Sequence, residues 1–376
     1  MERYYFDHNA TTPVSPEVLE AMLPVMTEVY GNASSMHHFG QAARHKLDTA
    51  RRQVAQTFGA QPEEIVFTSG GTEADNLALF GVGGHVVTTA VEHPAVLGAA
   101  AQMDSTVVPV DGRGVIDPDA VRRALRPGTK LISVMHANNE TGVIQPIEEI
   151  ARIAADAGVL VHSDGVQAIG KIPVDPQALG VSGVSLYAIS GHKIGAPKGV
   201  GALYVRKGTK LRAMMYGGRH ERERRAGTEN VAGAVGLARA AEWIMEHGAA
   251  EAIRVGDLRD QLETGILSRI PDVHVNGAGA PRTSNTSNLR FDGIDSDALL
   301  IALDLRGFAV SSGAACSSGA PEPSHVLLAM GLTREQARSS IRFSLGRTNT
   351  PEQVDALVDA VADAVSHLRK LSPTYV

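Results

Sequence analysis

The sequence predicts an α/β protein built around a largely parallel β-sheet, and two observations lead to this prediction. Short, nearly continuous apolar runs recur over the first part of the chain, and such runs are typical of strands that are covered on both faces. Amphipathic helical patterns lie between these runs, and the alternation of strand, helix and strand indicates parallel pairing. The predicted strands are residues 64–68, 85–89, 131–135, 159–162, 185–189 and 201–205.

One helix of this series can be delimited directly. Residues 146–157 place four apolar side chains on one helical face, those of Ile147, Ile150, Ala151 and Ala154. Gly158 follows, and glycine commonly caps the carboxyl end of a helix. The segment therefore predicts an amphipathic helix between two buried strands.

The pattern changes after about Gly256, where short strands mix with helices. Strand-like segments and helical patterns alternate at 273–275, 286–291, near Asp295, near Ser324 and at 351–371. This mixture is typical of an α+β arrangement. We expect a large domain of residues 15–255 and a smaller α+β domain made of residues 1–14 and 256–376.

Composition narrows the class of protein. The chain has 376 residues and a formal net charge of −6, which argues against a nucleic-acid-binding protein. No apolar run approaches the roughly 18 residues of a membrane span, and the first residues lack the apolar segment of a secretory signal. We therefore expect a cytoplasmic protein. Its single cysteine, Cys316, rules out an internal disulfide or a Cys-pair metal site, and we predict no metal centre.

The first candidate motif is Ser190-Gly191-His192-Lys193, which directly follows an apolar strand. A lysine at the end of a buried strand is costly unless it is used or paired. Schiff-base chemistry requires such a desolvated lysine, and Ser190 and His192 could hold a phosphate beside it. A solvated lysine in a glycine-rich loop is the alternative.

Asp164 and Gln167 form the second motif. Asp164 follows the strand at 159–162, at the edge where open α/β sheets bind ligands. Its carboxylate could pair with a pyridinium nitrogen and make that ring an electron sink, and Gln167 could donate to the phenolic oxygen of the same ring. Asp164 could instead be only the N-cap of the next helix.

The third motif, Gly70-Gly71-Thr72, lies between a strand and a helical pattern. Adjacent glycines let the backbone approach an anion, which the free amides of a helix start can bind. The segment lacks the Gly-Lys-Ser/Thr of a nucleotide-binding loop. A simple helix cap is the alternative.

Three single residues complete the candidates. Cys316 is surrounded by Ser, Gly and Ala, a composition that favours an exposed, reactive thiol over a buried one. His93 follows a predicted strand and could stack on a flat ring or move protons, although a structural role is the alternative. Arg342 alternates with two apolar residues in a strand-like segment and suits the capture of a carboxylate, or it could be a surface charge.

The order of these motifs is more specific than any one of them. Together with the segments 9–13, 136–142, 225–230 and 340–346, the series resembles the cysteine desulfurases of the NifS/IscS type. These belong to the class V aminotransferase group of fold-type I pyridoxal-phosphate enzymes. The resemblance runs from about Tyr4 to about Leu371, and its most specific parts are Gly191-His192-Lys193 and the loop around Cys316.

The resemblance implies a role for each matched position. Lys193 would bind the cofactor, pyridoxal 5'-phosphate, as a Schiff base. The other implied cofactor contacts are Asp164 at the ring nitrogen, Gln167 at the ring oxygen, His93 stacked on the ring, Gly71, Thr72, Ser190 and His192 at the phosphate, and Thr228 reaching it from the other subunit of a homodimer. Asn139 and Arg342 would bind the substrate carboxylate, and Asn139 would also touch the cofactor ring.

The implied reaction takes sulfur from L-cysteine. Lys193 would remove the α-proton, His93 would assist proton transfer, and the Cys316 thiolate would attack the substrate sulfur. The products would be L-alanine and a Cys316 persulfide, which passes to an acceptor protein. The long loop around Cys316 is similar to that of the group serving iron–sulfur cluster scaffolds. Gly165 and Gly195-Ala196 depart from the frequent residues of the family close to the cofactor.

Two other functions remain open at this point. A selenocysteine lyase or another class V enzyme would share most of these residues, although an aminotransferase needs no cysteine. A non-catalytic docking protein with the same fold is a second alternative, but such a protein would be expected to lack Lys193 or Cys316, and this chain has both.

Overall fold

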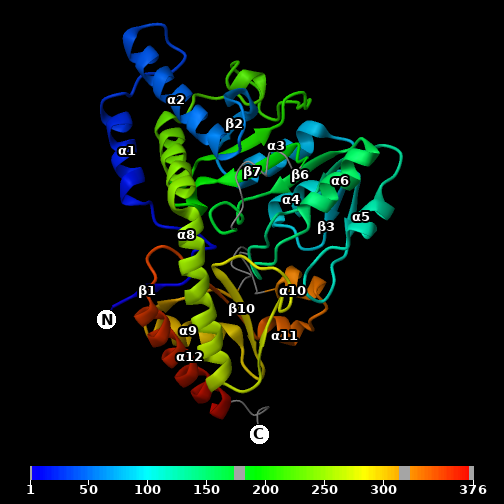
Figure 1. Cartoon of the computed structure of the whole chain (residues 1–376), viewed down its shortest axis with the longest axis vertical. Helices are drawn as coiled ribbons and strands as arrows, with labels where there is room; N and C mark the ends of the chain where they lie inside the picture. The colour runs from blue at the N-terminus through cyan, green and yellow to red at the C-terminus, as the bar shows by residue number, and fades with distance from the viewer. Residues whose placement is uncertain (1, 173–182, 313–321, 372–376) are drawn as a thin grey trace.

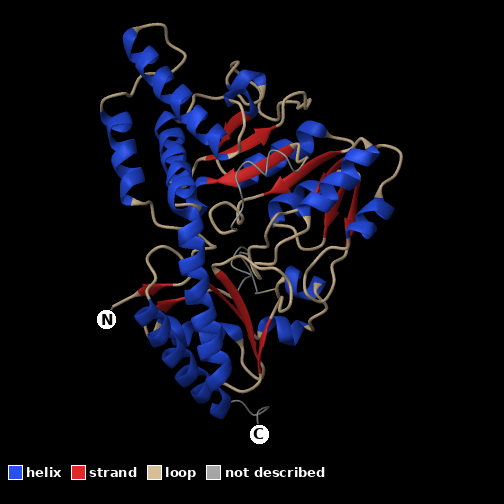
Figure 2. Cartoon of the chain, in the orientation of Figure 1, coloured by secondary structure: helices blue, strands red, loops and turns tan. Residues whose placement is uncertain are grey.

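The computed structural model describes residues 2–172, 183–312 and 322–371. Within these residues the strands form a main sheet of seven strands and a second sheet of three (Figures 1 and 2). The order in the main sheet is β2-β8-β7-β6-β5-β3-β4. Its strands are β2 (Ile65–Thr68), β3 (His85–Thr89), β4 (Ser105–Val108), β5 (Thr129–Ser133), β6 (Leu160–Asp164), β7 (Leu186–Ser190) and β8 (Gly201–Val205).

The main sheet confirms the predicted α/β class. Strands β4, β3, β5, β6 and β7 pair in parallel, whereas β8 runs antiparallel to both of its neighbours. Three details differ most from the sequence prediction. β5 begins and ends two residues earlier than expected, and β6 ends two residues later, so that Asp164 is its last residue and does not follow it. β4 was not predicted, because its Ser105 and Thr106 interrupt the apolar pattern that marks the other strands.

Helices cover both faces of the main sheet. One face packs against α2 (His38–Thr57), α5 (Pro118–Ala124), α6 (Ile147–Ala157) and the first part of α8 (Val231–Arg269). The other face packs against α3 (Gly71–Val82) and α4 (Pro94–Ala100). α6 ends as predicted, with Gly158 in the left-handed conformation at φ 65°. Coverage on both faces explains why the strands are apolar along their whole length.

The second sheet has the antiparallel order β12-β10-β9, with β9 (Val273–Val275), β10 (Thr286–Phe291) and β12 (Ser340–Ser344). It shares a separate hydrophobic core with the last part of α8, α9 (Ser296–Asp304) and α12 (Pro351–Leu371). The N-terminal strand β1 (Tyr4–Tyr5) joins this region by pairing with β11 (Phe308–Ala309). The other α-helices among the described residues are α1 (Pro16–Thr27), α10 (His325–Ala329) and α11 (Arg334–Arg338).

Helix α8 connects the two sheets. It is 39 residues long, continues without a break through Gly256, and runs past both sheets (Figure 1). The expected change in pattern at Gly256 therefore falls inside one helix. In the described part of the chain no helix combines the length and the apolar character that crossing a bilayer would require.

Candidate active site

A cavity of about 390 Å³ lies between the carboxyl ends of the main-sheet strands on one side and β12 with the N-terminal segment on the other. Ten residues predicted as site residues line it together: Gly71, Thr72, His93, Asn139, Asp164, Gln167, Ser190, His192, Lys193 and Arg342. Parallel strands end at the same edge of a sheet, so segments far apart in sequence meet there. The predicted site residue Thr228 is not among the described lining residues, and Cys316 lies outside the part of the chain that the structure describes.

Lys193 lies at the end of a short turn that follows β7. This turn, η2 (Gly191–Lys193), passes so close to the neighbouring strand that a Cβ on Gly191 would lie 3.0 Å from the backbone oxygen of Val200. The Lys193 Nζ donates to the backbone oxygen of Asn9 at 2.5 Å and to that of Ala10 at 2.7 Å. Lys193 is therefore held inside the cavity by the N-terminal segment and is not a solvated loop lysine.

Asp164 ends β6 with a buried carboxylate. Its Oδ1 accepts a hydrogen bond from the amide of Val166 at 2.9 Å, so the turn-capping role considered from the sequence is present alongside the cavity position. Burial raises the pKa of Asp164, while the charges of His93 and Lys193 oppose that rise. Gly165 is required here, because a Cβ would lie 1.9 Å from Cε1 of Tyr187. This contact accounts for glycine at this position, where the sequence departs from the residue frequent in the family.

The start of α3 forms a cradle in the cavity wall. A Cβ on Gly71 would lie 2.7 Å from Cγ2 of Val166, so only glycine lets the backbone amides of this first turn reach the cavity. No side chain caps the helix, and Thr72, Ser190 and His192 lie around the same space. Free amides at a helix start attract an anion. The residues present therefore fit a phosphate group.

The surroundings of His93 and His192, the two histidines of this wall, lower the pKa of both side chains. The Nδ1 of His93 accepts from the amide of Ala95 at 3.1 Å, which caps α4, so Nε2 carries the hydrogen. Burial lowers the pKa of His93. Burial and the charges of three lysines lower the pKa of His192 to about 4, and its Nδ1 lies 3.1 Å from Oγ1 of Thr11.

Arg342 reaches the cavity from β12, on the opposite wall. It is 3% exposed, which excludes a surface charge. Its Nη2 donates to Oδ1 of Asp7 at 2.7 Å and its Nη1 to the backbone oxygen of Asn139 at 3.0 Å. The Nε of Arg342 has no hydrogen-bond partner among the described residues. A buried guanidinium that lines a cavity and has a donor without a partner among the described residues suits a carboxylate ligand.

Sequence reasoning assigned no role to five residues that line this cavity, and two of them, Asn9 and Asp75, have polar side chains. Asn9 joins both walls: its Nδ2 donates to the backbone oxygen of Asn139 at 3.1 Å and to Oγ1 of Thr286 at 2.8 Å. Asp75 lies one helical turn after Gly71 and is 1% exposed. Its Oδ1 is 3.4 Å from Nε2 of His162. The one-turn spacing on α3 was the signal that could have identified Asp75.

Thr228 is exposed and lies away from the cavity of its own chain, so its predicted contact with a phosphate across a dimer stays a prediction. Cys316 lies outside the described residues. The described residues on either side of its segment contact the cavity wall. Before the segment, Ser311 forms a β-bridge with Arg342 of β12. After it, the Ser324 hydroxyl donates to the carboxylate of Glu140, the neighbour of Asn139.

Comparison with known proteins agrees with this geometry. The family model for aminotransferase class-V matches residues 4–357. A cysteine desulfurase of Gluconacetobacter diazotrophicus is 48% identical over 99% of this chain and 96% of its own length. The cysteine desulfurase IscS of Methanosarcina thermophila is 45% identical over 98% of this chain and 93% of its own length. The solved structure of a NifS-like protein, 37% identical, superposes with a TM-score of 0.89 over 97% of this chain and 100% of its own. The chain therefore belongs to the aminotransferase class-V family and, as its motifs predicted, to the NifS/IscS type of cysteine desulfurase within it.

Proposed function

We propose that this enzyme removes sulfur from L-cysteine with the help of pyridoxal 5'-phosphate, releases L-alanine, and holds the sulfur as a persulfide on Cys316. One observation carries the proposal. A single cavity gathers an anion cradle, a buried carboxylate and a desolvated lysine, contributed by three separate strand ends of the main sheet. These are the groups that a phosphate, a pyridine nitrogen and an aldehyde would require of a protein.

The residues present fit the cofactor. Gly71 opens the cradle for its phosphate, Asp164 supplies a carboxylate for its ring nitrogen, and Lys193 supplies an amine for its aldehyde. When bound, the cofactor supplies an electron sink for the carbanion formed at the substrate α-carbon. Gln167 would donate to the ring oxygen, and the ring of His93 would stack on the cofactor ring.

The opposite wall positions the substrate. Arg342 and the side chain of Asn139 bind the carboxylate of cysteine, which sets the direction in which the α-carbon faces Lys193. Lys193 takes the α-proton at Nζ. Its two backbone acceptors on Asn9 and Ala10 keep the amine near the cavity when it is not linked to the cofactor.

Cys316 then receives the sulfur. Its thiolate attacks the sulfur of the substrate, the bond between that sulfur and the substrate β-carbon breaks, and the electron pair returns to the carbon skeleton, which leaves as alanine. Cysteine and the Cys316 thiol are thereby converted into alanine and a Cys316 persulfide. The contacts of Ser311 and Ser324 with the cavity wall support this role, because both flanks of the segment start beside the substrate-binding wall.

We also propose a homodimer. Large apolar side chains are exposed on α1 and on the segment that follows it, namely those of Leu19, Leu23, Met26, Tyr30 and Met36. Several exposed apolar side chains close together in the sequence favour association. Thr228 would reach the phosphate cradle of the partner from such a dimer.

We further propose that the sulfur acceptor is an iron–sulfur scaffold protein and that the enzyme acts in the cytoplasm.

The two hydrophobic cores support the division into a large domain of residues 15–255 and a small domain of residues 1–14 and 256–376. α8 belongs to both cores. We therefore place the boundary between the two domains inside α8, so that this continuous helix connects them.

The purified enzyme, given L-cysteine and a reductant, is expected to form alanine and sulfide in equal amounts. Cys316→Ser is expected to abolish alanine formation while the bound cofactor retains its absorption band, and Ser318→Ala, in the same segment, serves as the matched control. Undiminished alanine formation by Cys316→Ser would rule out the proposed role. A kcat/KM for selenocysteine far above that for cysteine would favour a selenocysteine lyase instead.

A further inference from the structure

Lys171 is a buried lysine next to the cavity that no sequence motif identified. It lies one turn after Gln167, in the segment that follows β6, and is 8% exposed. Its Nζ donates to Oδ1 of Asn9 at 3.0 Å and to Oε1 of Gln167. Both acceptors are neutral amide oxygens, whereas a buried ammonium usually faces a carboxylate. Stability alone therefore does not explain its position.

The side-chain amide of Gln167 has one orientation that its neighbours accept. Its Nε2 lies 3.0 Å from the backbone oxygen of Asn9, which can only accept a hydrogen bond. Its Oε1 faces the Nζ of Lys171, which donates. Because the two ends of an amide differ only in donor and acceptor character, such partners decide which way it points. One hydrogen of Nε2 goes to Asn9, and the other is left for the cavity that Gln167 lines.

The same network fixes Asn9. Its Oδ1 accepts from Lys171 and also from Nδ2 of Asn285 at 3.0 Å, while its Nδ2 donates to Asn139 and Thr286. The hydrogen-bond partners therefore determine which end of each side-chain amide is the donor and which is the acceptor, from Asn285 through Asn9 and Lys171 to Gln167. Removing Lys171 leaves Asn9 with its other partners but leaves Oε1 of Gln167 without its donor.

We infer that Lys171 is a positioning residue, which holds the amide of Gln167 with its NH₂ group toward the cavity, so that Gln167 meets the phenolic oxygen of the cofactor as a hydrogen-bond donor. This inference rests on the proposed function, since it assumes that the cofactor ring lies against Gln167. Without Lys171 the amide could turn and present an oxygen to another oxygen, which repels.

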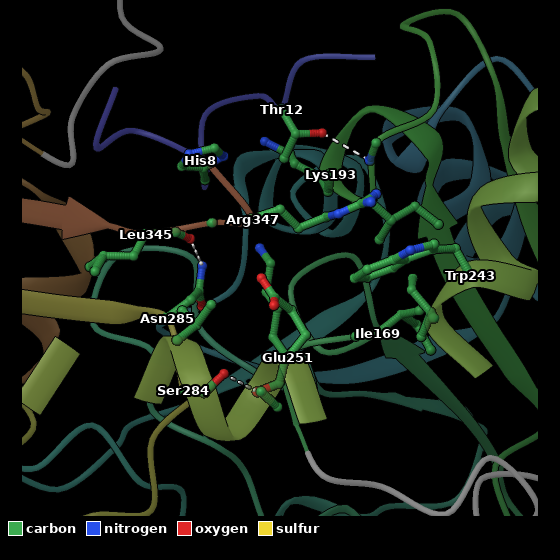
Figure 3. Close-up of a pocket in the computed structure, with 18 residues that line it drawn as sticks. His8, Thr12, Ile169, Lys193, Trp243, Glu251, Ser284, Asn285, Leu345 and Arg347 are labelled. Carbon is green, nitrogen blue, oxygen red and sulfur yellow. Dashed lines mark hydrogen bonds between the residues drawn. The ribbon is translucent and has the colours of Figure 1, made fainter. Parts of the chain in front are cut away.

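Lys171 also lies near Lys193, and its effect on Lys193 must be separated from its effect on Gln167. Both lysines line a smaller cavity of about 90 Å³. Figure 3 shows Lys193, Trp243 and Arg347 around this cavity. Burial, and then the charges of Lys193 and Arg342, lower the pKa of Lys171 well below its ordinary value. Removing its charge could therefore affect Lys193 directly. A double-mutant cycle with Gln167 separates this effect from positioning.

The experiment uses the full-length chain without cofactor, titrated with pyridoxal 5'-phosphate and followed by absorbance. The wild type is compared with Lys171→Met, Gln167→Leu and the double variant. Each single change is expected to raise the dissociation constant about tenfold, the loss of one hydrogen bond. The double variant is expected to remain near tenfold, because both changes remove the same contact. The absorption band of the bound cofactor is expected to shift equally in the two single variants.

Lys207→Met, which changes an exposed lysine, is the control and is expected to leave the dissociation constant unchanged. The melting temperature of each cofactor-free variant reports folding, and Lys171→Leu replaces the methionine variant if that one does not fold. Effects that multiply in the double variant, or an unchanged affinity in Lys171→Met, would overturn the inference while leaving the contact of Gln167 intact. An unchanged affinity in Gln167→Leu would overturn both that contact and the inference.

Discussion

The two walls of the cavity are built in different ways. The main-sheet wall consists of short segments that each follow a strand, so Gly71, Asp164 and Lys193 are placed by the local chain and by the shared sheet edge. The opposite wall depends on contacts between distant segments. Arg342 is held by Asp7, and Asn9 links Asn139 to Thr286.

This difference suggests a division of labour. A wall whose backbone is anchored to one rigid sheet suits a permanently bound cofactor, because the backbone positions of Gly71, Asp164 and Lys193 are set by that sheet, although the N-terminal segment contacts the side chains of Lys193 and Gln167. A wall that is assembled from the N-terminal segment and β12 suits a substrate that enters and leaves. Changes on the first wall should therefore affect the cofactor, and changes on the second should affect substrate binding.

The largest effect is expected at Lys193, where the two walls meet. Lys193→Ala removes the amine that binds the cofactor and takes the α-proton, so turnover is expected to fall at least about a thousandfold. Borohydride reduction followed by peptide mass measurement is expected to label Lys193 in the wild type only. Lys198→Ala, at an exposed position five residues on, is the control. Turnover that survives in Lys193→Ala would contradict the assignment.

Asp164 tests the main-sheet wall. Asp164→Asn keeps the size of the side chain but removes its charge, and kcat is expected to fall about a hundredfold because the electron sink weakens. Asp75→Asn is the matched comparison. Burial, and then the charges of Asp164 and Glu92, raise the pKa of Asp75 well above its ordinary value. Because this environment disfavours the charged form of Asp75, the loss of its carboxyl is expected to change kcat less than the loss at Asp164. Equal losses in both variants would remove the distinction between the two carboxyls.

Arg342 tests the opposite wall. Arg342→Lys keeps the positive charge next to Asp7 but loses the fork that binds a carboxylate, so KM for cysteine is expected to rise about 10- to 100-fold. The dissociation constant of the cofactor is expected to stay the same. Steady-state kinetics and a cofactor titration of the same preparation measure both quantities. A loss of cofactor affinity as large as the rise in KM would mean that the walls are not functionally separate.

Glu92 gives the smallest effect, on stability. Burial, aided by the charge of Asp164, raises the pKa of Glu92 to about 8 from an unfolded value of 4.5. Between these pH values the folded chain keeps a proton that the unfolded chain releases, so stability from this group is complete below pH 4.5 and is lost as the pH rises through 8. Glu92→Gln cannot ionise. Its melting temperature relative to the wild type is expected to rise by a few degrees between pH 5 and pH 8, and parallel pH profiles would contradict the shift.

Much of the main-sheet wall could be predicted from the sequence. Asp164 and Lys193 follow apolar runs directly, and the carboxyl ends of parallel strands meet at one edge, so their proximity followed from the pattern. The sequence pattern could not decide, however, whether Asp164 and His93 have a structural role or line the site. Asp164 both caps a turn and lines the cavity, and His93 both caps α4 and lines the cavity. One side chain can cap a turn or helix and also line a cavity, and a local sequence pattern does not reveal that it does both.

The opposite wall was accessible only in part. The alternation around Arg342 indicated that it points away from its apolar neighbours, but not that it is buried, because the elements that cover it come from the N-terminus and from Asn139. Lys171 gave no signal, since a lysine in a turn is usually solvated. Its burial depends on Asn9, a residue 162 positions away along the chain.

The sequence alone determined the α/β class, the edge of the sheet where the chemistry takes place, and the family, because strand periodicity and motif order are properties of the chain itself. The tertiary structure decided which polar groups are paired, which carboxyls have a raised pKa and how the amide of Gln167 points. These properties depend on burial and on partners from distant segments, and no local pattern contains them.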